Sequence, residues 1–537
     1  GTTTFELYNR NTTKQKGIGV NATNEHESTY GARIQTKGMS FDIIPVMDNS
    51  IDTPEETAID TLSRPPRFDL KDFTKRVAVI AVPVALQNLL STTGTMVDTM
   101  MIAPLGENAV GAVGLCSQYA LLMLAGYWGF VGGGMLFFSQ YWGAQDHKGI
   151  SRSFGLTWMC MMTVSIIFGV LALFFPQAIM RMYTDKIAIQ KIGIEYLKVI
   201  GYAYPFQVTA IAMSALLRAT ERVKIPLYAA ICSVFSNILL NWALIGGHWG
   251  FPAMGVQGAA LATVCASAIN VVVIMILSAA AKYPYLFMFK DHFAWKGDKV
   301  KEFFRKSFPI ICNEVFIGIG NLTINMVLGR QSEQAIAALA VFRTFEGFIV
   351  GFFSGFSNAS SVVVGKCVGA GELRLAYERA KRLIPMCQIC ILIEGVIVNL
   401  IKPYAFTAMG LSGESFAICS SLVLIYSCAA VLRMGNWSMN DTFRASGDSF
   451  TGTALEMGFM YVMVLPAVCL AGLKFKQSIL IVFSLCYCDE IVRYILMTIH
   501  LYTGKWIRPV TPEGKAVLAD FRRSLGKRRP KGRDIIH

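Results

Sequence analysis

The sequence predicts an all-α integral membrane protein with twelve transmembrane helices in two six-helix lobes related by an internal repeat. Composition is the first reason. Hydrophobic residues make up 54% of the 537 residues and charged residues only 16%, a balance that a soluble protein of this size does not sustain on its surface. The second is self-similarity. Adding 226 to a residue number in the first half often gives the same residue type in the second, as for Pro83 and Pro309 or Gly94 and Gly320.

Twelve apolar segments are long enough to cross a hydrocarbon core of about 30 Å, which takes about 20 helical residues. In chain order they are residues 77–102, 108–140, 152–180, 192–217, 226–246, 255–281, 303–329, 334–365, 380–401, 416–440, 450–472 and 477–502. Six fall in each copy of the repeat. We therefore expect an N-lobe over residues 68–281, a linker over 282–302 and a C-lobe over 303–502.

Lys and Arg gather in alternate connections between these segments and in the tail over residues 503–537. Basic residues favour the cytoplasmic side, so both termini are predicted to be cytoplasmic, in the plasma membrane of a bacterium (its inner membrane). The tail is better explained by attraction to anionic lipid than by nucleic-acid binding. Residues 1–67 are polar and lack periodicity, which predicts a disordered cytoplasmic extension.

The chain lacks the motifs of an enzyme. Residues 364–367 have neither the upstream glycine nor the hydroxyl of a phosphate-binding loop, and the six histidines are not spaced as metal ligands. The thirteen cysteines are scattered through apolar segments, as small buried residues are. We therefore expect no enzymatic activity, no cofactor, no disulfide and no structural metal. A gradient of protons or sodium is then the expected energy source for any transport.

Asp98 is the acidic residue that lies well inside an apolar segment of the first half. Ionisable residues within a membrane are costly and usually mark an ion pathway. Its segment also contains Pro83, which removes a backbone hydrogen bond, and Gly94, which tolerates bending. We expect Asp98 to couple to a proton or sodium ion, and Pro83 and Gly94 to let this helix change shape.

Oxygen-bearing side chains occur on later segments of the same half. Asn237 and Asn241 are four residues apart and so share a helix face, and Thr263 lies on the next segment. Together with Asp98 they can coordinate sodium or relay a proton. Alternatively, the amides and the hydroxyl make ordinary hydrogen bonds between helices, which is the favoured interpretation for Thr263 taken alone.

Several signatures between residues 70 and 505 resemble the MATE (multidrug and toxic compound extrusion) transporters. They are Pro83 to Asp98 within Val97-Asp98-Thr99-Met100-Met101, Gly143-Ala144 with its copy Gly369-Ala370, Leu217-Arg218-Ala219 with its copy Phe443-Arg444-Ala445, and Asn237 to Asn241. The resemblance implies two lobes that alternate access and export amphipathic or cationic small molecules in exchange for sodium or protons. It also implies that Asp98, Asn237, Asn241 and Thr263 form a cation site in the N-lobe. Some members have aspartate where Asn241 stands, so the choice between sodium and proton stays open.

The second half differs in chemistry from the first. Ile324 stands where the shift places Asp98, and the buried acid moves to Glu314, which the resemblance suggests as a second coupling residue. Asp441 and Tyr127 are candidates for lining a cavity. Arg343 and Glu346 are further candidates, although their three-residue spacing favours a structural ion pair.

Two other functions remain open. A lipid-linked oligosaccharide flippase of a related fold requires a basic cavity, for which Arg343 and Arg433 are the available hints. A membrane scaffold or sensor without transport is the alternative from a different class, and it gives no reason to bury Asp98. We expect the exporter to act as a monomer on small-molecule substrates.

Overall fold

The computed structural model describes residues 70–295, 297–408 and 413–526, and the predicted extension over residues 1–67 lies outside them. The N-lobe comprises α2 (Leu70–Ile102), α3 (Glu107–Gly143), α4 (His147–Phe174), α5 (Pro176–Tyr183), α6 (Ile187–Ile200), α7 (Ala203–Ala219), α8 (Lys224–Gly246) and α9 (Gly255–Ala280). The C-lobe comprises α11 (Gly297–Leu328), α12 (Glu333–Gly369), α13 (Leu373–Ala408), α14 (Gly413–Ala445), α15 (Thr451–Phe459), α16 (Leu465–Cys469), α17 (Ile479–Leu485) and α18 (Glu490–Thr503). A final helix, α19, covers Pro512–Gly526.

Ten helices of the described residues are long and apolar enough to cross a membrane, and α6 with α7, which are bent by 53°, make an eleventh span. The twelfth expected helix, residues 477–502, is divided into α17 and α18. Asp489 and Glu490 lie at the break and pair with Arg493. With 7 and 14 residues, α17 and α18 are each too short to cross the membrane alone.

The eleventh expected segment, residues 450–472, is irregular. Two π-helical segments, η3 (Met460–Val464) and η4 (Leu470–Lys474), flank α16. Pro466 at the start of α16 has no backbone N–H to donate, so the preceding turn cannot keep its regular hydrogen bond. Single π turns of this kind are enriched at functional sites, and Glu456 lies on α15 one turn before η3.

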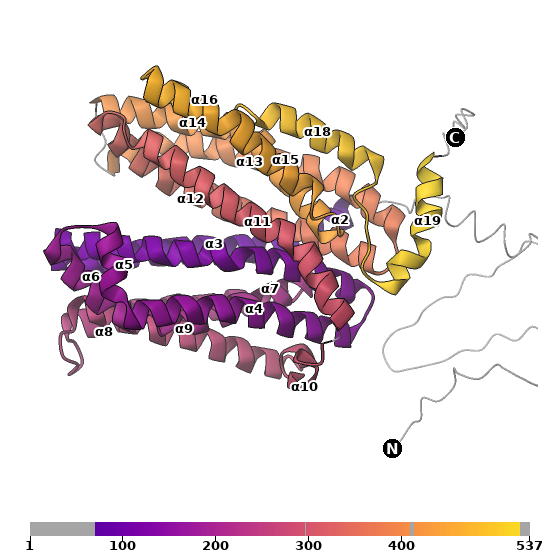
Figure 1. Cartoon of the computed structure of the whole chain (residues 1–537), viewed down its shortest axis with the longest axis horizontal. Helices are drawn as coiled ribbons and strands as arrows, with labels where there is room; N and C mark the ends of the chain where they lie inside the picture. The colour runs from indigo at the N-terminus through magenta and orange to yellow at the C-terminus, as the bar shows by residue number, and fades with distance from the viewer. Residues whose placement is uncertain (1–69, 296, 409–412, 527–537) are drawn as a thin grey trace, which may run out of the picture. The chain divides into compact units, whose positions relative to one another are not determined.

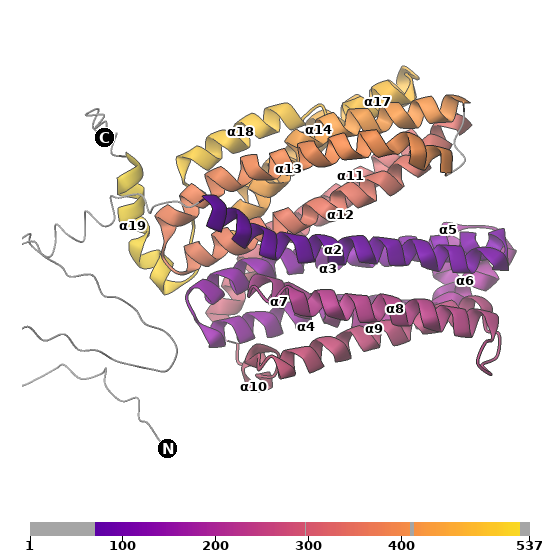
Figure 2. The same ribbon diagram turned by 180° about the vertical axis from the view of Figure 1, so that it is seen from behind.

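The two lobes meet along α2, α3, α11 and α12. The first helix of each lobe packs against the second helix of the other: α2 against α12 and α11 against α3. Figures 1 and 2 show the resulting two helical layers, which diverge toward the end that carries α5 and α6. The internal repeat is therefore expressed as a pseudo-two-fold pairing of helices across the contact between the two lobes.

Close backbone contacts obey the same repeat relation. A Cβ on Gly355 would lie 2.9 Å from the Ala85 nitrogen, and a Cβ on Gly129 would lie 2.9 Å from the Ile311 nitrogen. At one end of the interface, a Cβ on Gly369 would lie 1.9 Å from the carbonyl oxygen of Gln140. A Cβ on the repeat-related Gly143 would lie 2.0 Å from the Lys366 carbonyl oxygen. Only glycine permits such an approach, so α3 and α12 cross backbone to backbone at this end.

Polar contacts between the lobes reinforce the crossing. The Gln140 amide nitrogen donates to the Ala445 carbonyl (2.8 Å), and its oxygen accepts from the Val510 N–H (2.8 Å). Lys366 pairs with Glu221 of the other lobe at 2.6 Å. Because the described contacts gather near the α3–α4 and α12–α13 turns, this conformation is closed at that end.

The connection between the lobes is folded. It contains η2 (Pro284–Leu286) and α10 (Phe289–His292), and buried His292 makes a 2.9 Å hydrogen bond to the Tyr285 carbonyl. Helix α11 begins at Gly297, before the apolar segment predicted over residues 303–329. Its first turns are polar, so hydropathy did not include them. At the other terminus, α19 packs through Phe521 on Tyr377 of α13.

Candidate functional site

The N-lobe brings Asp98 of α2 together with the two predicted amides of α8. The Asn241 amide nitrogen donates to Asp98 Oδ1 at 2.7 Å and to Asn237 Oδ1 at 3.3 Å. Gly94 lies one turn before Asp98, and a Cβ there would approach Val234 of α8 to 3.3 Å. The small residue thus lets α2 and α8 come close enough for the carboxylate to reach the amides.

The remaining N-lobe candidates are placed differently. The Thr263 hydroxyl donates to the Ala259 carbonyl of its own helix at 3.0 Å, so the structure gives it no hydrogen bond to Asp98. Pro83 lies inside α2, close to Ala81 and Ala85, where α12 approaches. Proline there leaves one carbonyl of the preceding turn without its usual donor.

The Asp98 cluster is rich in oxygen acceptors. Asn241 is only 1% exposed, and its buried Oδ1 atom has no hydrogen-bond partner. Buried amide oxygens are normally satisfied, and a carboxylate with amide oxygens beside it is the donor set that a hard cation prefers. Among the described residues, no group of three or more His, Cys, Asp and Glu side chains is placed to hold a metal ion.

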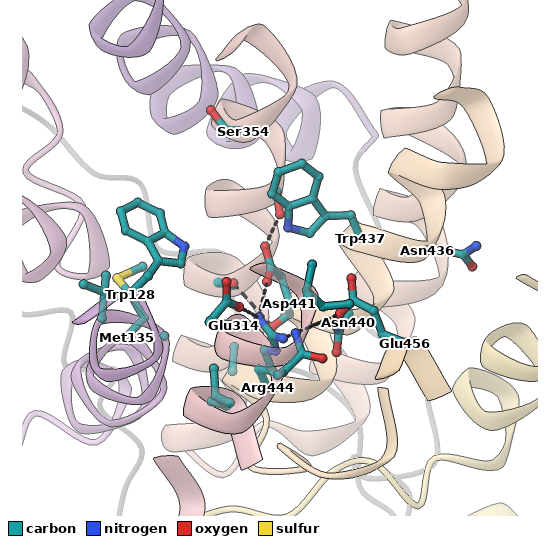
Figure 3. A pocket seen from close by; sticks show the side chains of 18 of the residues that line it. Trp128, Met135, Glu314, Ser354, Asn436, Trp437, Asn440, Asp441, Arg444 and Glu456 are labelled. Atoms are coloured by element: carbon teal, nitrogen blue, oxygen red, sulfur yellow. Dashed lines mark hydrogen bonds and ion pairs between the residues drawn. The ribbon is translucent and has the colours of Figure 1, made fainter. Parts of the chain in front are cut away.

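A cavity of about 330 Å³ lies between α3 of the N-lobe and the interior of the C-lobe. Figure 3 shows Trp128 and Met135 of α3 on one side of it and Glu314, Asp441, Arg444 and Glu456 on the other. Its lining combines aromatic and apolar surface with charged groups and amides, as small-molecule sites commonly do. Glu314 and Asp441 are therefore brought to one cavity.

Arg444 is the centre of the charged group. Its Nη1 lies 3.3 Å from Glu314 Oε1 and 3.9 Å from Asp441 Oδ1, and its Nη2 lies 3.8 Å from Glu456 Oε2. Ser357 donates a hydrogen bond to Asp441. Three carboxylates thus surround one guanidinium in a largely buried place, with a formal excess of two negative charges. Such an excess is expensive in a low dielectric unless protons or cations neutralise it.

Unused hydrogen-bonding capacity surrounds the same group. Glu456 accepts from Asn313 (3.1 Å) and Asn440 (2.9 Å), which leaves the Oδ1 atoms of both amides buried without a donor. Arg444 Nε and Nη2 also lack hydrogen-bond partners, because the contacts of Nη2 are longer than a hydrogen bond. The site therefore has oxygen acceptors that are available to a cation, and some of its own donors and acceptors are not hydrogen-bonded to one another.

Two other arginines of the lining also lie beside acids, although Glu346 is shared between Arg433 and Arg343. Arg433 lies 3.8 Å from Glu346 and stacks over the rings of Tyr426 and Tyr487. Arg493 lies 3.4 Å from Asp489 and 2.7 Å from Glu490. Among the described residues, neither arginine forms an ion pair with Glu314, Asp441 or Glu456.

Three residues proposed for the cavity lie outside its lining. Tyr127 is buried in the core, whereas its neighbour Trp128 contributes to the wall. Arg343 and Glu346 pair with each other, and Arg343 Nη2 also donates to Asn325 at 2.6 Å. Their ion pair is the structural one that the spacing favoured.

Sequence reasoning missed most of the polar wall. In the sequence Arg444 belongs to a repeated signature, which gives no sign that it partners acids. Glu456 is the acidic residue of its apolar segment, the same signal that identifies Asp98, so the sequence could have revealed it. The amides Asn313 and Asn440 carry no such signal, because amides are frequent in membrane helices.

Comparison with known proteins agrees with this geometry. The MatE family profile matches residues 83–243 and 309–469, two stretches whose ends are related by the same shift as the internal repeat. The chain is 24% identical over 399 residues to the probable multidrug resistance protein YoeA of Bacillus subtilis. This alignment covers 73% of this chain and 85% of that protein. It is 22% identical over 451 residues to the probable multidrug resistance protein NorM of Thermotoga maritima, covering 82% and 95%.

The fold is shared with solved structures of the same group. A crystal structure of a MATE mutant superposes with a TM-score of 0.71 at 16% identity, covering 82% of this chain and 98% of that one. At such identity the likeness concerns the fold. Because the family profile matches both halves of the repeat, the chain belongs to the MATE family of multi-pass membrane transporters.

Proposed function

We propose that the protein is a secondary active exporter of amphipathic or cationic organic compounds, driven by antiport with protons or sodium. It works in the plasma membrane with both termini in the cytoplasm, where the basic connections are expected. In this orientation the conformation described above is closed toward the cytoplasm. Rocking of the two lobes about α2, α3, α11 and α12 exposes the cavity to each side in turn.

The observation that carries the proposal is the excess of acid around Arg444. A cationic compound in the 330 Å³ cavity meets Glu314, Asp441 and Glu456 on one side and the indole of Trp128 on the opposite lobe. Protons or sodium ions neutralise the same carboxylates when no compound is bound. Compound and coupling ion therefore compete for one charge, which gives the negative coupling that antiport requires.

Asp98 supplies a second ion site in the N-lobe. Its carboxylate, Asn237 Oδ1 and the unpaired Asn241 Oδ1 offer oxygen ligands to sodium, or the carboxylate alone takes a proton. Occupation of this site changes the charge at the α2–α8 contact, and α2 also packs on α12 of the other lobe. Ion binding at Asp98 is thereby linked to the contact that must change during transport.

The cavity chemistry favours an exporter of cations over the flippase of a related fold. A flippase for phosphate-linked sugars needs positive charge that is free to bind its anion, yet Arg493 is held by Asp489 and Glu490, and Arg433 lies beside Glu346, which it shares with Arg343. Arg444 is outnumbered by its acids. A scaffold without transport gives no account of the acids gathered around Arg444 or of Asp98 inside α2.

Efflux of a fluorescent cationic dye from expressing cells tests the proposal, with the proton and sodium gradients collapsed separately. Wild-type efflux should stop with one gradient, and Asp98→Asn and Glu314→Gln should each abolish it. Glu107→Gln, which changes an exposed acid at the start of α3, is the matched control and should export normally. Normal efflux by both site variants would exclude these carboxylates from coupling.

A further inference from the structure

A second, smaller cavity lies at the closed end, where the N-lobe meets the connection between the lobes. It measures about 70 Å³ and is bounded by the α3–α4 hairpin, Trp295 of the connection and the first turns of α11. Its polar lining consists of Tyr141, Asp146, Arg152, Ser153, Trp295 and Lys299. None of these residues takes part in the two ion sites described above.

Two donors in this cavity have no acceptor. Arg152 Nε and Trp295 Nε1 are both buried atoms without a hydrogen-bond partner. Within the described ranges, Arg152 forms no ion pair with any acid. Buried N–H donors are almost always satisfied, and an arginine kept beside an unpartnered indole N–H indicates an acceptor that the polypeptide itself does not provide.

The remaining charges of the lining are largely engaged. Asp146 accepts from the Gly149 N–H at 2.8 Å and so caps α4. Lys299 pairs with Glu302 at 3.3 Å and interacts with Tyr141 of the lining, and because 54% of its side chain is exposed, it can exchange these partners for a ligand. Arg152, Lys299 and the indole N–H therefore approach the cavity from three different elements, which suits a multidentate oxyanion.

We propose that this cavity binds a phosphate group, as the headgroup phosphate of an anionic lipid or as free inorganic phosphate. Arginine is the side chain best matched to phosphate, because its planar N–H groups bond two oxygens at once. Basic pockets between helices on the cytoplasmic side are typical sites for anionic headgroups. The volume admits one phosphate but not the body of a transported organic compound.

Binding here has a conformational consequence. Arg152 belongs to α4 of the N-lobe and Lys299 to α11 of the C-lobe, so a phosphate between them joins the lobes where they are already closed. The ligand stabilises this conformation over one that is open at the same end. The inference holds whatever compound the protein exports, since it concerns a separate site.

The test follows the thermal stability of the full-length protein in nanodiscs. The discs contain phosphatidylcholine alone, phosphatidylcholine mixed with phosphatidylglycerol, or phosphatidylcholine with millimolar inorganic phosphate in the buffer. Phosphatidylglycerol should raise the Tm of the wild type, and Arg152→Gln should lose most of that rise. The same rise with inorganic phosphate in phosphatidylcholine alone would identify the free ion as the source. Lys290→Gln, an exposed change on α10 outside the cavity, should keep the full response.

Trp295→Phe is a second variant for the case in which Arg152→Gln does not fold. It preserves the aromatic bulk, removes the N–H donor and should reduce the response to phosphatidylglycerol or phosphate. An equal rise in Tm for the wild type, Arg152→Gln and Trp295→Phe would overturn the proposal. So would a wild type whose Tm is the same in all three conditions.

Discussion

Replacing Gly369 by alanine perturbs the crossing of α3 and α12 at its closest point. The new Cβ would lie 1.9 Å from the Gln140 carbonyl oxygen, about 1.5 Å short of the 3.4 Å at which ordinary van der Waals contact begins. Backbone on both sides prevents relief by a side-chain rotation. We therefore expect Gly369→Ala to lower the free energy of unfolding by about 1–3 kcal/mol, the usual cost of overpacking.

Thermal unfolding of the purified full-length protein in detergent measures the effect. Gly114→Ala is the control, because it lies on exposed α3 surface with no atom within 4 Å of the added Cβ, and it should not destabilise. Gly143→Ala strains the repeat-related contact at the same crossing. Moving the two helices apart once relieves both clashes. The double variant should therefore lower the free energy of unfolding by less than the sum of the two single variants. Additive costs, or a Gly369→Ala variant as stable as Gly114→Ala, would refute the close crossing.

Three further predictions concern buried polar groups. Arg444→Met leaves Glu314, Asp441 and Glu456 without their cation and should lower the free energy of unfolding by about 3–5 kcal/mol; unchanged stability in chemical unfolding would contradict the ion cluster. Asn241→Ala removes the donor to Asp98 and should cost about 1–3 kcal/mol, more than Asn237→Ala in the same melt, and the reverse order would count against it. Burial opposes the ionisation of Asp448, but bonds from His500 and Thr451 and the nearby Arg508 lower its pKa below 3.8. Its ionised form thus stabilises the fold above that pH, so the stability lost in Asp448→Asn should shrink as the pH falls below about 4, and a constant deficit would be evidence against it.

The repeat and the apolar segments predicted most of the fold. The shift that relates the two halves anticipated which glycines correspond, and the structure places one such pair, Gly143 and Gly369, at the lobe interface. Hydropathy could not foresee the bend between α6 and α7, because it depends on local geometry within an apolar run. Nor could it foresee that α2 packs against α12, since partner choice between apolar helices is set by shape.

The site was predicted unevenly for a physical reason. A lone acid in an apolar helix is conspicuous, so Asp98 and Glu314 stood out from the sequence. The amide oxygens of Asn313 and Asn440 indicate a binding site only because no donor lies within reach of them in the folded protein, which the sequence alone does not show. Arg444 likewise becomes informative only when Glu314, 130 residues earlier on α11, and Glu456 of α15 are seen around it together with Asp441 of its own helix.

Ion-coupled transport by the purified protein tests the central claim most directly. The measurement is movement of a cationic dye across sealed proteoliposomes on which either a proton gradient or a sodium gradient is imposed. The account predicts dye movement opposite to the flow of one ion, and none when Asp98→Asn or Glu314→Gln replaces the wild type. Dye movement that is equally fast without either gradient, or that both variants retain, would contradict antiport through these carboxylates.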